Sequence, residues 1–156
     1  MATRPDPSEP APACTSPQQL CFAEALRAAN RSINRLYARH LDGMDITPGQ
    51  TAILTRLYYA GEITMAELAE QMGTERTTMV RNVAPLEATG HILQRPADQG
   101  RAHLYRLSDT GMAALRTALP HWQAAQDALR AELGDALWES LLDGLRRLAE
   151  IDSGVR

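Results

Sequence analysis

Side-chain types that suit nucleic-acid contacts are concentrated in one short segment. Residues 75–82 read Glu-Arg-Thr-Thr-Met-Val-Arg-Asn, and a threonine precedes them. Arginine can donate two hydrogen bonds to a guanine edge, asparagine can pair with adenine, and threonine can bond a phosphate or touch a thymine methyl group. If the segment starts a helix, its free backbone amides also favour phosphate. The candidate contacts are Thr74, Arg76, Thr77, Thr78, Arg81 and Asn82.

The charge of the chain fits such a partner only locally. The formal net charge of −3 by itself argues against nucleic acid. Between residues 74 and 106, however, arginines outnumber carboxylates, and this stretch adds the candidate contacts Arg95, Asp98 and Arg101. All basic residues are arginines, which suit phosphate and guanine, although a base-composition bias in the genome would give the same pattern. Taken alone, Arg76 and Arg81 could simply solvate an exposed helix face.

Helix start and stop signals in the sequence predict the elements that position these residues. Thr47-Pro48-Gly49-Gln50 predicts the start of a helix that Gly61 ends, and a capping box at 64–67 starts a short helix that reaches Gly73. Thr74 can cap the next helix, which Gly90 ends. Its predicted buried face consists of Met79, Val80, Val83 and Leu86. Pro85 removes a helical hydrogen bond, so a kink or an early end is expected there.

Two short stretches after Gly90, residues 91–95 and 102–107, predict a two-stranded hairpin with a basic tip at 96–101. Helix, tight turn, second helix and hairpin follow one another in the order of a winged helix-turn-helix. In that arrangement the second helix can enter the major groove, while the tip of the hairpin reaches phosphates or the minor groove.

Longer helices flank this centre. A start signal at Ser16-Pro17 predicts a first helix to about Leu41, and Ser108 starts two final helices that Gly134 separates, with a possible bend at Pro120. The final helices carry more leucine and tryptophan than the small core can cover, which indicates an interface. The fold class is therefore mainly α with a small β-hairpin wing. The predicted parts are a disordered tail (1–16), an N-terminal dimerisation helix (17–47), a winged helix-turn-helix core (48–108) and C-terminal dimerisation helices (109–156).

Several segments together resemble the MarR family of bacterial regulators. They are Met65-Ala66-Glu67-Leu68-Ala69, residues 75–82, Pro85-Leu86-Glu87, and Asp98-Gln99-Gly100-Arg101 running on to residues 107–111; the resemblance spans about residues 20–148. It implies a homodimer joined by the first and last helices, in which each chain offers one winged helix to half of a palindromic DNA operator. By position, Thr77, Thr78 and Arg81 match the family's groove-reading helix, Arg101 its wing-tip arginine, and Asp98 a residue that orients the wing.

The resemblance also implies repression that is relieved by a small molecule or an oxidant. The preferred hypothesis is a small aromatic effector between the dimer helices and the core, with Tyr37, His40 and Tyr58 as candidate lining residues. The apolar runs are too short to span a bilayer, so we expect a soluble cytoplasmic protein without a membrane partner.

The two cysteines offer an alternative effector mechanism. Leu20-Cys21-Phe22 partly resembles the peroxide-sensing OhrR branch of the family, and Cys14 could reach Cys21 as a resolving thiol if the tail folds back. In that branch the cysteine is paired with tyrosines, and here Pro48 stands where a second tyrosine would be expected. The simpler interpretation is that Cys21 fills space at a helical interface.

Enzyme and metal chemistry are not indicated. No base or oxyanion arrangement accompanies Cys21, as a thiol peroxidase would need, and no phosphate-binding glycine loop or carboxylate pair is present. A metal site would need the cysteines together with His40, His91, His103 or His121, and no compact ligand spacing exists. We therefore predict no enzyme activity, no cofactor and no metal, with the histidines at surfaces, wing or interface. A winged helix used only for protein contacts remains a further alternative.

Overall fold

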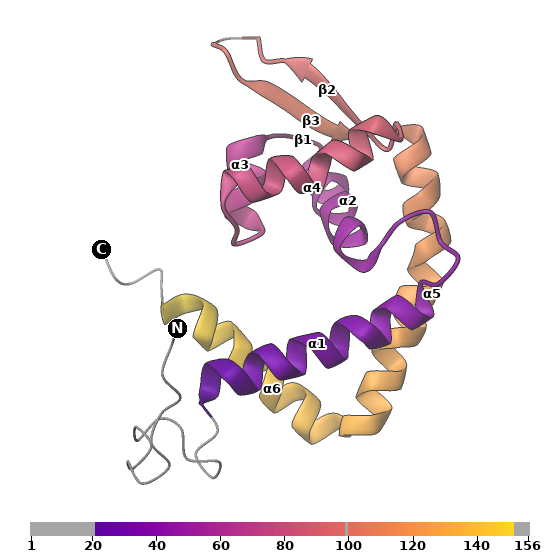
Figure 1. The fold of residues 1–156 in the computed structure, drawn as a ribbon, viewed down its shortest axis with the longest axis vertical. Coiled ribbons are helices and arrows are strands. Elements are labelled where there is room, and N and C mark those ends of the chain that lie inside the picture. Colours follow the sequence, from indigo (N-terminus) through magenta and orange to yellow (C-terminus); the bar gives the residue numbers. More distant parts are fainter. Residues whose placement is uncertain (1–20, 99, 152–156) are drawn as a thin grey trace, which may run out of the picture. The chain divides into compact units, whose positions relative to one another are not determined.

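The computed structural model describes residues 21–98 and 100–151. These residues form six helices and three short strands, and this confirms the predicted class, mainly α with a small wing (Figure 1). In chain order they are α1 (Phe22–His40), α2 (Pro48–Ala60), β1 (Glu62–Thr64), α3 (Met65–Gln71), α4 (Arg76–Ala88), β2 (Ile92–Pro96), β3 (His103–Leu107), α5 (Asp109–Leu133) and α6 (Asp135–Ile151). The predicted tail and the start signal at Ser16 lie outside the described residues.

The chain divides into two compact units, one ending at Leu36 and the other beginning at Tyr37. The first unit holds most of α1, which buries none of its residues and leaves Phe22 and Leu26 exposed. The second unit holds the remaining helices and the sheet, and it contains the hydrophobic core.

Helices α2 and α3 begin at the two predicted capping boxes. The Thr47 hydroxyl accepts a hydrogen bond from the amide of Gln50 (3.3 Å), and the Gln50 side chain accepts one from the amide of Thr47 (2.8 Å). Thr64 and Glu67 repeat this exchange at 3.3 and 2.9 Å. Hydrogen bonds from the hydroxyl and amide of Thr64 hold the pKa of Glu67 below its usual value. Both helices therefore begin where local side-chain chemistry satisfies their free amides.

Helix α4 differs from its prediction in three respects. Its N-cap is Glu75 rather than Thr74, and Glu75 makes no side-chain capping bond. The amide of Thr74 donates to the carbonyl of Ala69 in the preceding turn. Pro85 does not end the helix, which continues to Ala88. Val80 is 47% exposed rather than buried, since the buried positions are spaced as Met79, Val83 and Leu86.

The predicted hairpin is confirmed, but the sheet has a third strand that was not predicted. The order is β1-β3-β2, and both pairings are antiparallel. Glu62 lies opposite Arg106, and Arg106 lies opposite Leu93. In Figure 1 the β2–β3 hairpin extends beyond α4, as expected of a wing.

The base of the wing is joined to α5 by a close contact. The Ser108 hydroxyl donates to the carbonyl of Gly90 (2.6 Å) and accepts from the amide of Gly111 (2.9 Å), so it caps α5 as predicted. Helix α5 runs through Pro120 to Leu133, and Gly134 separates it from α6 as predicted. None of the helices in the described part of the chain is long and apolar enough to cross a membrane.

Candidate DNA-binding surface

The surface of α4 presents the side chains that the sequence predicted for DNA contacts. Arg76, Thr77, Arg81 and Asn82 are exposed, whereas Thr74 and Thr78 are half-buried. Met79, Val83 and Leu86 are almost fully buried, so they fix the rotation of the helix and direct the polar residues outward. The exposed face can therefore offer guanidinium, amide and hydroxyl groups to base edges and phosphates.

Arg81 is held close to its neighbour on the preceding turn. Its Nη2 atom donates to the hydroxyl of Thr78 across 3.4 Å, which leaves its other donors available. A pocket of about 430 Å³ between the start of α2 and α4 is lined by both Arg81 and Asn82. The groove-reading candidates thus border a concave surface rather than a flat one.

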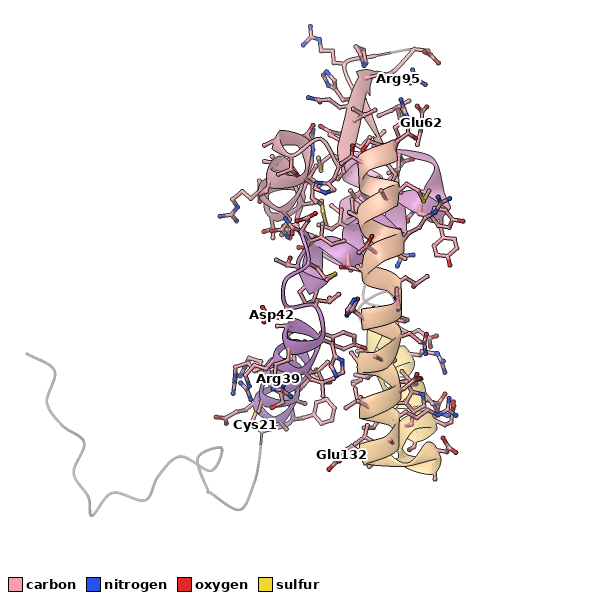
Figure 2. All side chains as sticks on the ribbon, turned by 90° about the vertical axis from the view of Figure 1, so that its right-hand side faces the viewer. Cys21, Arg39, Asp42, Glu62, Arg95 and Glu132 are labelled. Carbon is pink, nitrogen blue, oxygen red and sulfur yellow. The ribbon has the colours of Figure 1, made fainter. Side chains whose placement is uncertain are left out.

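The two candidate arginines of the wing differ in their surroundings. Arg101 is exposed near the tip, whereas the Arg95 guanidinium binds Glu62 through two hydrogen bonds of 3.1 and 2.7 Å and Asp98 through one of 3.0 Å. Figure 2 labels Arg95 and Glu62, which lie side by side at the wing. The hydrogen bond from Arg95, together with the charge of Arg106, holds the pKa of Glu62 below its usual value. Arg95 is therefore already paired within the protein, whereas Arg101 faces solvent.

Two residues of this surface were not singled out by the sequence analysis. Val80 was assigned to the buried face, and its position one residue before the exposed Arg81 is the signal that could have placed it on the recognition face. Glu62 carries no local signal, because its partner Arg95 lies 33 positions further along the chain.

Comparison with known proteins identifies the winged core. Residues 44–102 match the family model described as the MarR family. This segment of the chain, the winged core, is similar to the MarR family. An uncharacterised HTH-type transcriptional regulator of Bacillus cereus is 29% identical over 125 residues, covering 77% of this chain and 83% of that relative. The winged core is therefore similar to regulators of transcription.

Solved structures of transcriptional regulators are also similar to this chain. The transcriptional regulator MosR of M. tuberculosis, in complex with DNA, superposes with a TM-score of 0.79 at 28% identity, covering 88% of this chain and 99% of that chain. A probable transcriptional regulator from Pseudomonas aeruginosa gives a TM-score of 0.75 at 29% identity, covering 81% and 96%. Both likenesses extend well beyond residues 44–102.

The three predicted pocket residues, Tyr37, His40 and Tyr58, do not line the 430 Å³ pocket beside α4 or the larger pocket beside α5. Tyr37 packs against Trp122 with ring centroids 6.5 Å apart, and burial raises its pKa. Tyr58 is exposed and contacts Tyr59 edge to face, and His40 is half-buried at the end of α1. A pocket of about 560 Å³ between α2 and α5 is lined instead by Arg56, Tyr59, Leu119 and Trp122, together with Pro48, Thr51, Ala52, Thr55, Gln71, Met72 and Leu115.

The cysteine and histidine predictions have mixed outcomes. Cys21, which is labelled in Figure 2, is exposed with a free thiol just before α1, and its carbonyl oxygen accepts a hydrogen bond from the amide of Ala25. Cys14 lies outside the described residues. His91, expected at a surface, in the wing or at an interface, is buried at 6% exposure directly before β2, and its Nδ1 lies 2.6 Å from the Thr89 hydroxyl. Within residues 21–98 and 100–151, no group of three or more His, Cys, Asp or Glu residues could hold a metal ion.

Proposed function

We propose that the protein is a repressor that binds a palindromic operator as a homodimer, with α4 in the major groove and the wing at the backbone or the adjacent minor groove. The observation that carries this proposal is the exposed polar face of α4, fixed by its buried opposite face. Support comes from MosR, a relative whose solved structure includes DNA. The candidate contacts are those of the sequence analysis, except that Arg95 acts within the wing.

The dimer part of the proposal is supported by an uncovered apolar stripe. Leu137, Leu141 and Leu145 recur every four residues along α6 and are 49%, 45% and 44% exposed. A stripe of this kind on a surface helix marks an interaction site. We assign the outer regions 17–47 and 109–156 to dimerisation and region 48–108 to DNA binding. A twofold dimer would then present two copies of α4 to the two halves of a palindrome.

The effector part of the proposal rests on the pocket between α2 and α5. Tyr59 and Trp122 supply aromatic surfaces, and Arg56 supplies a cation. A small aromatic molecule would stack on these rings, and binding there would engage both the core helix α2 and the long helix α5. An effector releases DNA only if it binds the DNA-free arrangement more tightly.

Oxidation of Cys21 is a second candidate for the release signal. The observation in its favour is that the thiol is exposed and free at the start of α1. The test is to expose the DNA complexes of wild type and Cys21→Ser to peroxide. Release that is unchanged in the variant would remove this candidate, and release lost in the variant would support it.

The repressor proposal is tested by protection mapping on the DNA that flanks the protein's own coding region, at several salt concentrations. We expect a symmetric footprint of two half-sites and an affinity that falls steeply with salt, because phosphate contacts release counterions. Repeating the mapping with a panel of small aromatic acids tests the effector. Absence of duplex binding at any salt concentration would contradict the proposal and favour a protein-contact module.

A further inference from the structure

The guanidinium of Arg95 donates hydrogen bonds to three other residues of the sheet and its turn. Its Nε and Nη2 atoms bind the two carboxylate oxygens of Glu62 at 3.1 and 2.7 Å. Its Nη1 atom donates to Asp98 at 3.0 Å and to the carbonyl of Pro96 at 3.2 Å. One side chain thus joins the start of β1, the end of β2 and the turn beyond it.

The ion pair spans the whole width of the sheet. Glu62 is on β1 and Arg95 is on β2, and the two strands are separated by β3. The register places Glu62 opposite Arg106, and Arg106 opposite Leu93, two residues before Arg95. Because side chains two residues apart on a strand share a face, Glu62, Arg106 and Arg95 lie on one face of the sheet.

The outer half of the hairpin has little else to hold it. Strand β1 pairs only with residues 104–106 of β3, so His103 and Pro96 pair with each other without a third strand beside them. A two-stranded hairpin on its own is only marginally stable in water. The ties from Arg95 to Glu62 and Asp98 restrain this half and with it the exposed Arg101.

We propose that Glu62 is a positioning residue for DNA recognition, which acts through Arg95 to hold the wing tip and Arg101 in place against the DNA. This inference rests on the proposed function. Both side chains of the pair are more than one-third exposed, so the pair contributes little to folding stability. Its effect therefore belongs in the geometry of the wing rather than in the stability of the fold.

The opposite interpretation of the pair makes an opposite prediction. If Arg95 were a phosphate contact that Glu62 merely neutralises, removal of the carboxylate would free a cation and strengthen DNA binding. If Glu62 positions the wing, its removal weakens binding by misplacing Arg101. The sign of one affinity change separates these two roles.

The experiment compares wild type, Glu62→Gln and Glu70→Gln by fluorescence anisotropy with a labelled operator duplex. The two variants change the net charge equally, but Glu70 is an exposed residue of α3 outside the wing. We expect Glu62→Gln to weaken binding at least about fivefold, near the lower end for loss of one arginine contact, and more than Glu70→Gln does. Binding that is equal to or tighter than that of Glu70→Gln would overturn the inference.

A double-mutant cycle tests whether Glu62 acts through the wing tip. In an Arg101→Ala background, Glu62→Gln should have almost no further effect, because the contact that it positions is already lost. Fully additive effects would contradict the inference. Amide exchange measured without DNA gives an independent readout: Glu62→Gln should speed exchange at residues 100–103, and unchanged exchange would also overturn it. If wild type binds no duplex, the proposed function fails, while this exchange measurement still decides the role of Glu62 in the wing.

Discussion

At the scale of single residues, Arg81 is the strongest candidate for reading a base. It is exposed on α4, and Thr78 holds one of its nitrogens while leaving the others free. A guanidinium that donates twice to a guanine contributes about 1–3 kcal/mol of discrimination. We therefore expect Arg81→Ala to weaken operator binding by about 1–3 kcal/mol and to relax preference at one base pair. Anisotropy titrations against the operator and single-base variants measure both effects.

A matched control for this prediction is Arg116→Ala. Arg116 is also an exposed arginine, and it lies on α5, outside the recognition helix and the wing. The same charge is lost, so any general electrostatic effect appears in both variants. Equal losses in Arg81→Ala and Arg116→Ala would argue against base reading by Arg81.

Val80 adds an apolar group to the same face. Its 47% exposure beside Arg81 suits contact with the methyl group of a thymine. We expect wild type to bind an operator with uracil in place of thymine more weakly than the normal operator, and we expect Val80→Ala to show a smaller difference between the two duplexes. Competition binding measures this. A thymine preference that is unchanged in Val80→Ala would exclude the contact.

At the scale of elements, sequence patterns succeeded where the determinants are local. The capping boxes at Thr47 and Thr64 and the cap at Ser108 each depend on residues three positions apart, and all three are present. Strand β1 was missed because it has only three residues and exists through pairing with β3. Thr74 was wrongly taken as a cap because the helix begins one residue later, with Glu75 at the N-cap position. Glu62 was missed for the same reason as β1, since its partner is distant in sequence.

The contact between α5 and the base of the wing leads to a stability prediction. A Cβ atom at Gly111 would collide with the carbonyl oxygen of His91 and lie 2.8 Å from the Leu107 side chain. The backbone carbonyl cannot move without shifting the start of β2. We expect Gly111→Ala to lower the free energy of unfolding by about 1–3 kcal/mol, as overpacking does. Denaturant unfolding at fixed protein concentration measures the change.

Gly49→Ala is the matched control for Gly111→Ala. Gly49 lies in the first turn of α2, and a Cβ atom there would meet nothing within 4 Å. Because alanine restricts the unfolded chain, this change should be neutral or stabilise by up to about 1 kcal/mol. If both variants lost the same stability, the loss could not be attributed to the contact with His91.

At the scale of the whole molecule, the proposed function depends on a surface that a single chain leaves uncovered. Helix α6 keeps Trp138, Leu142 and Leu148 half-buried, but its leucine stripe faces solvent. A monomer would present a single α4, so it could bind only one half-site of a palindrome at a time. The proposed dimer therefore connects the apolar stripe on α6 to the affinity of α4 for DNA.

This connection is tested by placing a charge on the stripe. Leu141→Asp should weaken the dimer by about 2 kcal/mol or more, because a carboxylate would be buried without a partner. Sedimentation equilibrium measures dimerisation, and affinity for the palindrome should fall toward that for a single half-site. Ala136→Asp adds the same charge to an exposed position about 140° around α6 and should leave the dimer intact. A Leu141→Asp protein that still dimerises and binds the palindrome like Ala136→Asp would remove α6 from the interface.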